Sequence, residues 1–504
     1  MNHNNTLHLI ILQPTDVLFF RDGRPMEGSL AGHTAAWPLP NVINHAFHAA
    51  LHRAGLSNVH LHRHGKSGEY SDDRDRKFGC LTTAGPFPLM LLNGEPPPDQ
   101  QKLYLPRPLD TEVNTPQKGL RGGEEYGLPR ASSTPGTEEK PTLTVTHLPV
   151  DGNWRATSSL PQPLLYPVAN QRPPTKETSP KKWISSQAYQ SYLNNSATQL
   201  ESNDSLSDSE IAELESTIGI AIDPATGTTG HGETEGKLYI ANYLRLRENF
   251  RMAVFAQAID KEAGDLIHAL FKDEPQSIIV GGQQRLCTAQ RKNAPQPLPL
   301  PIGLNKKEDF NRLNDGKYAV KWILLSPAIW PEIPENQSES IKYHPGGWLP
   351  NWVCPETGHV LLKAGDTDRK PGERRDDWRK RVRELPTIRA RLVAALVPKP
   401  LVVTGWALPN DVDRPEGGAK STHLAVPAGA VYYFEADSAE DAVALAHALN
   451  WHGETAGTSI KNRRSTLLGE KGFGLGVCGT WQFHRTNGSD HHKSAINNNP
   501  ERKP

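Results

Sequence analysis

The stretch LHLIIL at residues 7–12 decides how the fold begins, because a short continuous apolar run is typical of a strand buried on both faces. After a polar connection, residues 41–54 have apolar side chains at helical spacing, and we predict a helix there. Asn41 can cap this helix and Gly55 can end it. Its apolar stripe consists of Ile43, Phe47, Ala50 and Ala54. A strand, a long loop and a helix in this order form the first part of a split β-α-β unit.

The second half of the chain alternates strands and helices again. Residues 236–247, 317–325 and 426–435 are predicted strands, and residues 256–271 and 438–450 are predicted helices. The chain contains 42 glycines and 43 prolines, which disfavour long helices, so short strands and sizeable loops should dominate. We therefore predict an α+β fold of two related units with large loop insertions, of which the first starts as a ferredoxin-like (RRM-like) domain does.

The predicted domains divide the chain into three parts. Residues 1–235 form an N-terminal ferredoxin-like domain, residues 236–484 form a C-terminal ferredoxin-like domain, and residues 485–504 form a polar, disordered tail. The N-terminal domain contains two inserts, at about 93–181 and 194–209, which are rich in turn-forming and small polar residues.

A short helix is predicted at the end of the second insert. Ser207 and Glu210 have the spacing of a capping box, in which each residue binds the backbone amide of the other. The stretch 110–141 has almost no apolar content and is predicted to be an exposed excursion.

Charge, cysteines and hydropathy exclude several classes of protein. Lys+Arg and Asp+Glu both number 56 in 504 residues, so any nucleic-acid surface must be a local patch. The four cysteines lie far apart without CxxC spacing, which disfavours a zinc knuckle and fits a reducing cytoplasm. Neither the pattern of a signal peptide nor an apolar run of 18 residues is found, so we expect a cytoplasmic protein with no membrane partner.

The segment GEKGFGLGVCG at 469–479 is the strongest candidate site, with five glycines in eleven residues. Glycine lets backbone amides approach a ligand closely, and a row of bare amides binds phosphate oxygens without side-chain charge. Lys471 adds a cation. We predict that Lys471, Gly472, Gly474 and Gly476 bind RNA, and the alternative is a glycine turn with a purely structural role.

A dinucleotide site is disfavoured at this segment, although Gly474, Gly476 and Gly479 match GxGxxG. The dinucleotide fingerprint needs a helix after the glycines and a complete βαβ unit. Here TWQFHR at 480–485 reads as a strand, and the chain ends within 25 residues of Gly479.

Two arginine-containing turns are further candidates for RNA binding. Arg21 and Arg24 flank an Asp-Gly turn after the first strand, and guanidinium groups suit phosphate. Gly282 and Arg285 lie in GGQQR, which follows an apolar run. The alternatives are a turn with solvated charges for the first and a β-bulge for the second.

A charged run at 369–391 contains ten Lys/Arg and four Asp/Glu, and it is predicted to be helical with a break at Pro386. Phosphate neutralisation, partner docking or a solvated helix face would each explain it.

Histidine patterns give little support for metal binding. HAALH at 48–52 lacks the glutamate of HExxH, and HxHxH at 60–64 lies in a polar, Gly-rich stretch typical of a solvated loop. We expect no metal, no cofactor and no catalytic residue. A histidine such as His33 or His45 acting as the base in RNA cleavage is the open alternative.

Several blocks, in order, resemble one known family, the third subunit of the Cmr-type (type III-B) CRISPR effector complex in the RAMP superfamily. The resemblance spans about 7–483. The blocks are DVLFFRDGRPM at 16–26, PLPNVINHAFHAAL at 38–51, LPRPLD at 105–110, WISSQAYQSYL at 183–193, GIAIDPATGTTGHGETEGKLYIANYLRL at 219–246, VGGQQRLC at 280–287, WILLSPAIW at 322–330, GWLP at 347–350, HLAVPAGAVYYFE at 423–435 and GEKGFGLGVCGTW at 469–481. Within them, GGQQR has Gln where the family is expected to have an acidic residue.

This resemblance implies a non-catalytic, RNA-binding subunit of a ribonucleoprotein in antiviral defence. It implies two ferredoxin-like domains side by side and binding of the 5′ repeat-derived tag of the guide (CRISPR) RNA. It also implies docking to the large HD/palm polymerase-cyclase subunit and to a backbone RAMP subunit. A β-hairpin thumb at the boundary between tag and guide is expected within 105–160.

Three alternatives stay open: a RAMP endoribonuclease that processes repeat RNA, the similar fourth subunit of Csm-type complexes, and a purely structural interaction subunit.

Overall fold

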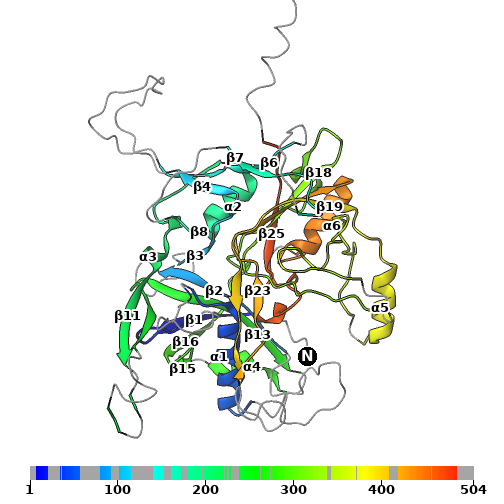
Figure 1. Ribbon diagram of the computed structural model, residues 1–504. Helices are drawn as coiled ribbons and strands as arrows, with labels where there is room; N and C mark the ends of the chain where they lie inside the picture. Colours follow the sequence, from blue (N-terminus) through cyan, green and yellow to red (C-terminus); the bar gives the residue numbers. More distant parts are fainter. Residues whose placement is uncertain are drawn as a thin grey trace, which may run out of the picture.

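The computed structural model describes most of the chain, and the structural statements that follow concern these residues. They are 7–20, 35, 37–56, 80–91, 101–114, 140–151, 161–171, 180–195, 197–220, 222–223, 226–228, 238–260, 263–272, 274–337, 342–370, 372–407, 418–455 and 457–484. The protein is a mixed α and β structure built mainly from antiparallel sheets with few helices (Figure 1). The predicted class of α+β is therefore confirmed.

The larger sheet contains the first strand of the chain. Its main path runs in the order β10-β8-β3-β2-β13-β1-β16-β15, and β14 pairs with β13. Its strands are β1 (His8–Pro14), β2 (Leu81–Leu91), β3 (Gln101–Pro106), β8 (Trp183–Ser185), β10 (Ser205–Leu206), β13 (Phe250–Asp260), β14 (Gly264–Asp265), β15 (Gln276–Ile279) and β16 (Leu286–Asn293). Helices α1 (Pro40–Arg53) and α4 (Leu266–Phe271) pack on one of its faces.

The second sheet is formed by the later part of the chain. It runs in the order β17-β18-β24-β19, with β25 paired to β18. Its strands are β17 (Asn311–Arg312), β18 (Tyr318–Leu324), β19 (Ala390–Leu396), β24 (Val431–Ala436) and β25 (Gly476–Gly479). Helix α6 (Ala439–Leu449) covers its outer face, and α5 (Arg375–Glu384) lies in the long connection between β18 and β19 (Figure 1).

Shorter elements complete the fold. They are α2 (Ser186–Asn194), α3 (Asp208–Ile211), the 3-10 turns η4 (Lys307–Asp309) and η6 (Gly469–Lys471), the sheet of β4 (Thr111–Asn114), β5 (Thr142–Val145) and β9 (Ala197–Gln199), and the pairs β6 (His147–Pro149) with β7 (Val168–Asn170), β11 (Ala212–Ile220) with β12 (Leu238–Leu246), β20 (Leu401–Val403) with β23 (His423–Ala425), and β21 (Trp406–Ala407) with β22 (Gly418–Ala419). Within the described residues, no helix is both long and apolar enough to cross a membrane.

The two sheets share one arrangement of their four main strands. Numbered in chain order, β1, β2, β13 and β16 lie side by side in the order fourth, first, third, second. The strands β18, β19, β24 and β25 lie in the same order. In each sheet a helix, α4 or α6, connects the third strand to the fourth.

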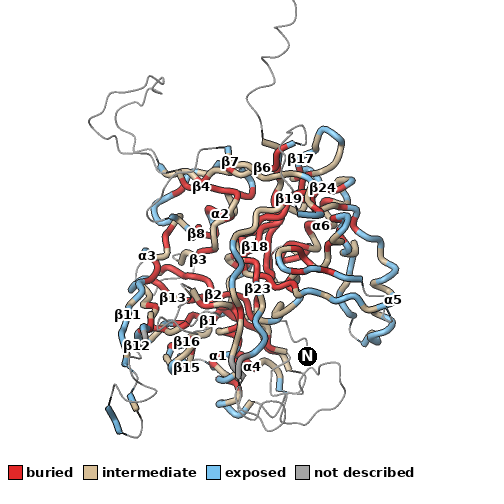
Figure 2. The backbone as a smooth tube through the Cα atoms, viewed as in Figure 1, coloured by how far each residue is buried: buried red, intermediate tan, exposed pale blue. Residues whose placement is uncertain are grey.

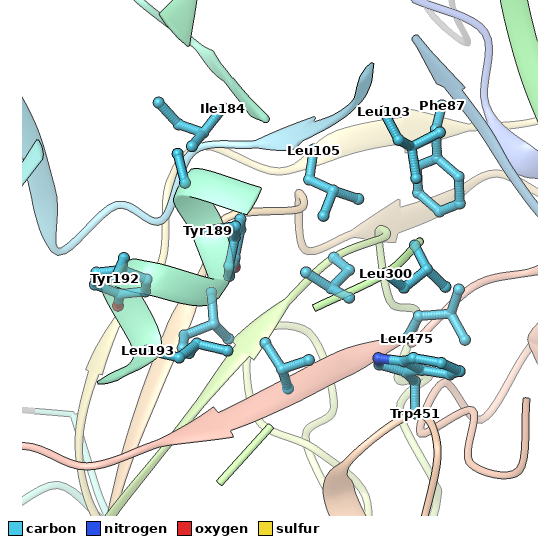
Figure 3. Close-up of a cluster of buried hydrophobic side chains, with 14 of the residues drawn as sticks. Phe87, Leu103, Leu105, Ile184, Tyr189, Tyr192, Leu193, Leu300, Trp451 and Leu475 are labelled. Carbon is cyan, nitrogen blue, oxygen red and sulfur yellow. The ribbon is translucent and has the colours of Figure 1, made fainter. Parts of the chain in front are cut away.

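The main core lies between the two sheets. Side chains from β2, β3 and α2 meet residues of the second sheet there, among them Phe87, Leu105, Tyr189 and Leu475 (Figure 3). Two further apolar clusters fill the outer faces of the sheets, and the buried chain runs through the middle of the molecule (Figure 2). Burial of this area from water is the main stabilising contribution to such a fold.

A buried ion pair connects the sheets. Lys321 of β18 donates to Asp110, with Nζ and Oδ2 2.5 Å apart, and to the hydroxyl of Tyr192 at 2.6 Å. The two charged side chains are 5% and 0% exposed. Removing one partner of such a pair leaves the other charge buried without compensation, so this contact fixes the position of the 105–114 connection against the second sheet.

Local predictions were met at several helices. α1 and α6 cover the predicted ranges, and Ser207 and Glu210 form the predicted capping box of α3. The N-terminus of α1 differs from the prediction. Pro40 occupies the first turn and Leu39 is the N-cap residue, so Asn41 does not cap the helix. Ala54 is exposed and lies outside the apolar stripe.

The predicted helix over 256–271 is confirmed only at its end, because residues 256–260 belong to a strand. Residues 250–260 form β13, and only α4 is helical. β13 is a central strand whose side chains are buried on both faces: Val254 and Ala256 pack under the helices, while Ala253 and Phe255 face the second sheet. A strand buried on both faces has no alternation, which is why its sequence resembled a helix.

The change from one sheet to the other falls between β16 and β17, after residue 293, rather than at residue 235. β13 pairs with β1 and β2 and so belongs to the first sheet. The predicted inserts also contribute to the core: β3 lies within 93–181 with Leu103 and Leu105 buried, and β9 and β10 lie within 194–209. The tail 485–504 lies outside the described residues.

Candidate nucleic-acid interface

The Gly-rich segment 469–479 lies inside the protein. Residues 472–479 are buried, and the strand after the glycines is the segment's own end, β25, rather than TWQFHR. Gly474 has φ +79°, and a Cβ there would collide with the backbone nitrogen of Ser465. A Cβ at Gly476 would collide with the indole of Trp322. Close packing within the chain therefore accounts for both glycines.

The amides of this segment bind other parts of the chain. Gly474 donates to the carbonyl of Pro327 at 2.7 Å, and Leu475 donates to the hydroxyl of Ser326 at 2.9 Å. Gly476 belongs to the ladder between β25 and β18. The row of bare amides that the composition suggested is thus already used by the fold.

Lys471 is the cation of this segment, and it lies half-buried at the junction of the two sheets. Its Nζ is 3.2 Å from Nε2 of His45 on α1. A Cβ at the neighbouring Gly472, which has φ +94°, would lie 2.8 Å from the carbonyl oxygen of Thr83 on β2. The segment therefore joins the second sheet to the first, and Lys471 and Glu470 lie at its outer edge.

The second glycine turn, GGQQR, is exposed at Gln283 and Gln284. It connects β15 to β16. Three of the four residues after Val280 have positive φ: Gly281 at +79°, Gln283 at +55° and Gln284 at +52°. The amide of Gly282 donates to the carbonyl of Phe19 at 2.9 Å. A Cβ at Gly282 would lie 2.7 Å from the ring of Phe19, so glycine lets the turn pack against this aromatic side chain.

Arg285 ends this turn within a group of side chains that we call the Tyr243 cluster: Phe19, Tyr243, Gln283 and Arg285. The guanidinium carbon of Arg285 lies 4.8 Å from the centre of the Tyr243 ring. The Phe19 and Tyr243 rings are 5.6 Å apart at 50°. The Tyr243 hydroxyl donates to Oε1 of Gln283 at 2.8 Å. The cluster joins the end of β1, the strand β12 and the turn before β16 at one place.

The electrostatics of the cluster favour an anionic ligand. Partial burial tends to raise the pKa of Tyr243, but hydrogen bonds with Gln283, Thr217 and Arg285 lower it. Within the described part of the chain, Arg285 has no carboxylate at ion-pair distance, and its Nε has no hydrogen-bond partner. By contrast, Arg245, which lies on the same strand as Tyr243, is paired with Asp16 at 2.9 Å. A stacked guanidinium without a carboxylate partner suits phosphate, and the half-buried rings of Phe19 and Tyr243 can stack on unstacked bases where they reach the surface.

The hairpin β11–β12 extends from this cluster away from the body of the protein (Figure 1). Its base is fixed by two backbone hydrogen bonds of 2.8 Å between Leu18 and Leu244. Along its length the hairpin exposes an aliphatic face. The members of this face and their exposed fractions are Leu214 57%, Ile218 71%, Ile220 53% and Ile240 38%. Tyr243 lies on the opposite face, since neighbouring residues of a strand alternate.

The structure thus brings together only some of the predicted site residues. Gly282 and Arg285 lie in the Tyr243 cluster, whereas Gly472, Gly474 and Gly476 are buried elsewhere with Lys471 at their edge. Arg21 and Arg24 lie outside the described residues, directly after Phe19 and Phe20 in the chain.

Sequence reasoning missed Phe19, Tyr243 and the hairpin, and the hairpin lies outside the range 105–160 in which a thumb was expected. The described part of that range forms β4, β5 and β6, which pack on the body of the protein. The alternation of apolar and polar residues in 236–247 was the available signal for the hairpin. Its partner strand β11 has the same alternation, with Leu214, Ile218 and Ile220 on one face, and this signal in the sequence was not used.

The histidines of the described residues do not form a metal site. In that part of the chain, no group of three His, Cys, Asp or Glu side chains is placed to hold a metal ion. His45 lies on α1 beside Lys471, while His33 and the HxHxH stretch lie outside the described residues.

Comparison with known proteins gives a family. Residues 10–481 match the family model described as CRISPR-associated protein (Cas_Cmr3). Two cryo-EM structures of the type III-B Cmr-beta, one bound to cognate target RNA and one bound to cognate target RNA and AMPPnP, contain similar chains at 13% identity. Each of the two alignments covers 84% of this chain and 86% of the similar chain, and the TM-scores are 0.35 and 0.33 respectively. No curated protein matches the chain. Because the family model spans nearly the whole sequence, the chain belongs to the Cas_Cmr3 family of CRISPR-associated proteins.

Proposed function

We propose that this chain is a non-catalytic RNA-binding subunit of a type III-B CRISPR ribonucleoprotein, which holds the 5′ repeat-derived tag of the guide RNA. Membership of the Cas_Cmr3 family supports the assignment to this class of complex. The observation that carries the RNA-binding role is Arg285, stacked on Tyr243 without a carboxylate partner at the base of an exposed hairpin. The chain acts in the cytoplasm, as part of antiviral defence.

Two ferredoxin-like units form the framework of this function. The shared strand order, fourth, first, third, second, is that of a ferredoxin-like sheet, and α4 and α6 occupy the same connection in the two sheets. The first unit consists of β1, α1, β2, β13, α4 and β16, and the second of β18, β19, β24, α6 and β25. On this proposal the two units divide after residue 293, and residues 92–249 are an insertion between the second and third strands of the first unit.

The Tyr243 cluster binds the tag. Arg285 holds a backbone phosphate, while Phe19 and Tyr243 offer ring faces to unstacked bases. Arg21 and Arg24, which lie outside the described residues, are further candidates for phosphate contact, because Arg21 follows Phe20 directly in the sequence. Phosphate contacts of this kind fix the position of the RNA without reading its sequence. The glycines 472, 474 and 476 hold Lys471 at the junction of the sheets, where it adds one further cation.

The hairpin β11–β12 is the thumb that separates the tag from the guide. Its aliphatic face, which includes Ile218 and Ile240, is exposed although the removal of aliphatic side chains from water is favourable. An apolar surface of this kind can lie against a base that is displaced from its stack. The large HD/palm polymerase-cyclase subunit and a backbone RAMP subunit dock on either side of the bound tag.

The test compares two guide RNAs in the reconstituted complex, one with its repeat-derived tag and one from which the tag has been removed. We expect the tagged RNA to bind at least about tenfold more tightly, because stacking on an aromatic side chain contributes about 1–3 kcal/mol per base. Equal affinity for the two RNAs would contradict tag recognition. The purified chain, incubated with repeat RNA in the absence of metal, should leave it intact, and site-specific cleavage would favour an endoribonuclease instead.

A further inference from the structure

Helix α5 is an exposed and strongly basic element that the proposed function does not use. It spans Arg375–Glu384 in the connection between β18 and β19, and none of its residues is buried. It projects from the body on the side of the second sheet, whereas the hairpin β11–β12 lies at the other side of the molecule (Figures 1 and 2). The helix is thus remote from the Tyr243 cluster.

The helix is nevertheless held firmly at its inner side. The indole Nε1 of Trp378 donates to the carbonyl of Thr367 at 2.9 Å. Arg381 donates to the carbonyls of Asp366 and Asp368, both at 2.6 Å, and to the carboxylate of Glu373 at 2.9 Å. Hydrogen bonding with Arg381 lowers the pKa of Glu373 to about 2, so this carboxylate stays charged. These contacts fix the orientation of the helix even though it contributes nothing to the core.

The outer side of the helix is a stripe of cations. Arg375, Arg379 and Arg383 follow one another at intervals of four residues, and side chains at this spacing lie on one face of a helix. Lys380 lies beside them. One carboxylate approaches the stripe, Asp376, whose Oδ1 is 3.7 Å from Nη1 of Arg379. Within the described residues, Arg375, Arg383 and Lys380 have no carboxylate at ion-pair distance.

The stability of the helix explains the cation of Arg383 in its last turn but not the two arginines at its start. Arg374 is the N-cap residue and makes no side-chain capping hydrogen bond, and Arg375 is the first residue of the helix. The N-terminus of a helix carries partial positive charge, so cations are unfavourable there, and Ser, Thr, Asp or Asn are preferred as the cap. Asp376 and Asp377 lie in the first turn, where carboxylates are favourable, so the unfavourable cations are those of Arg374 and Arg375 alone.

We propose that α5 binds the phosphodiester backbone of a nucleic acid without regard to its sequence. Arginine forks match phosphate oxygens, and the stripe contains three exposed arginines on a helix whose orientation is fixed. A protein partner fits this surface less well, because protein interfaces have an apolar centre. The two apolar residues of α5, Trp378 and Val382, are half-buried on its inner side, so its outer face offers no such centre.

This surface provides a second nucleic-acid contact, separate from the tag site. Its ligand is either single-stranded RNA or a duplex, because both present the same phosphodiester charge. The two sources differ in salt dependence: each phosphate contact contributes about 0.9 to the slope of log affinity against log salt for duplex DNA and about 0.7 for a single strand.

The test compares the full chain with the variant R375Q/R379Q/R383Q. Fluorescence anisotropy measures, at several salt concentrations, the affinity of each protein for a labelled RNA that lacks the tag and for a labelled DNA duplex. We expect the magnitude of the salt slope to fall by about 2 on at least one probe, since three contacts are removed. The change in slope is divided by about 0.9 for the duplex and about 0.7 for the RNA, and the probe that loses more contacts identifies the source of the ligand. The matched control, K306Q/R312Q/K399Q, removes the same charge from exposed residues of the second half of the chain and should keep the slope.

Two outcomes would overturn the proposal. One is an unchanged slope on both probes when the variant retains the unfolding transition of the wild type. The other is loss of binding to an acidic protein subunit of the complex with unaltered binding of both nucleic acids, which would make α5 a protein contact. The variant Arg285→Ala should keep the contribution of α5, because the two surfaces are remote from each other.

Discussion

The two glycine turns of this protein occupy corresponding places in its two sheets and have opposite surroundings. GGQQR lies between α4 and β16, and the Gly-rich segment lies between α6 and β25, so each comes just before the fourth main strand of its sheet. The first is exposed and packs an arginine on a tyrosine ring. The second, although it has more glycines, is buried, and its amides are bound by the chain itself.

The difference shows that glycine content alone does not identify a ligand-binding loop. At Gly474 and Gly476, glycine is needed because other parts of the same protein approach too closely for a side chain. At Gly282, it is needed so that the turn can pack against Phe19 and leave Arg285 at the surface. What separates the two cases is whether polar groups remain available after folding. The following predictions test this comparison, in order of decreasing expected effect.

The largest effect is expected for Gly474→Ala. The new Cβ would collide with the backbone of Ser465, and alanine is strained at φ +79°. We expect the free energy of unfolding to fall by about 3 kcal/mol or more, measured by chemical denaturation. The matched control is Gly347→Ala, which has φ +66° but nothing within 4 Å of the added Cβ, and which should cost about 1 kcal/mol. Equal stability of Gly474→Ala and the wild type, with weaker RNA binding, would restore the segment as an RNA loop.

A smaller but specific effect is expected for Arg285→Ala. This change removes a half-buried cation that has no carboxylate partner among the described residues, so the affinity for tagged guide RNA should fall by about tenfold while the stability changes little. Binding is measured in the reconstituted complex, with Arg312→Ala as an exposed arginine control in the second sheet. If both variants bind the tagged RNA like the wild type, the Tyr243 cluster is not the tag site.

The smallest effect is expected for Lys471→Gln. This lysine already contacts His45, and residues 472–479 after it are buried, so we expect less than about a threefold loss of affinity for tagged RNA. The same anisotropy measurement, carried out beside Arg285→Ala, ranks the two turns directly. A larger loss for Lys471→Gln than for Arg285→Ala would reverse the comparison.

Local signals in the sequence predicted local structure. The apolar run at 7–12, the cap at Ser438 and the capping box of Ser207 and Glu210 gave β1, α6 and α3, because each depends on a few neighbouring residues. The family resemblance was also confirmed by the family model over residues 10–481.

Features that depend on distant contacts were not predictable in the same way. Residues 256–260 of β13 were predicted to be helical, because burial on both faces removes the alternation of a strand. The strand β25 consists of Gly476–Gly479, whose low strand propensity concealed it, and its burial between Trp322 and the main core is set by residues far away in the chain. The Tyr243 cluster needs β1, β12 and the turn before β16 to meet, and no spacing along the sequence encodes that meeting.

The central claim is that the exposed turn and its aromatic neighbours, rather than the Gly-rich segment, contact the guide RNA. Photochemical crosslinking of tagged guide RNA in the reconstituted complex, followed by peptide mapping, tests it most directly. We expect crosslinks in the peptides that contain Phe19 and Tyr243, and none at the buried Phe473. Crosslinks confined to the peptide of the Gly-rich segment, with none at Phe19 or Tyr243, would contradict it.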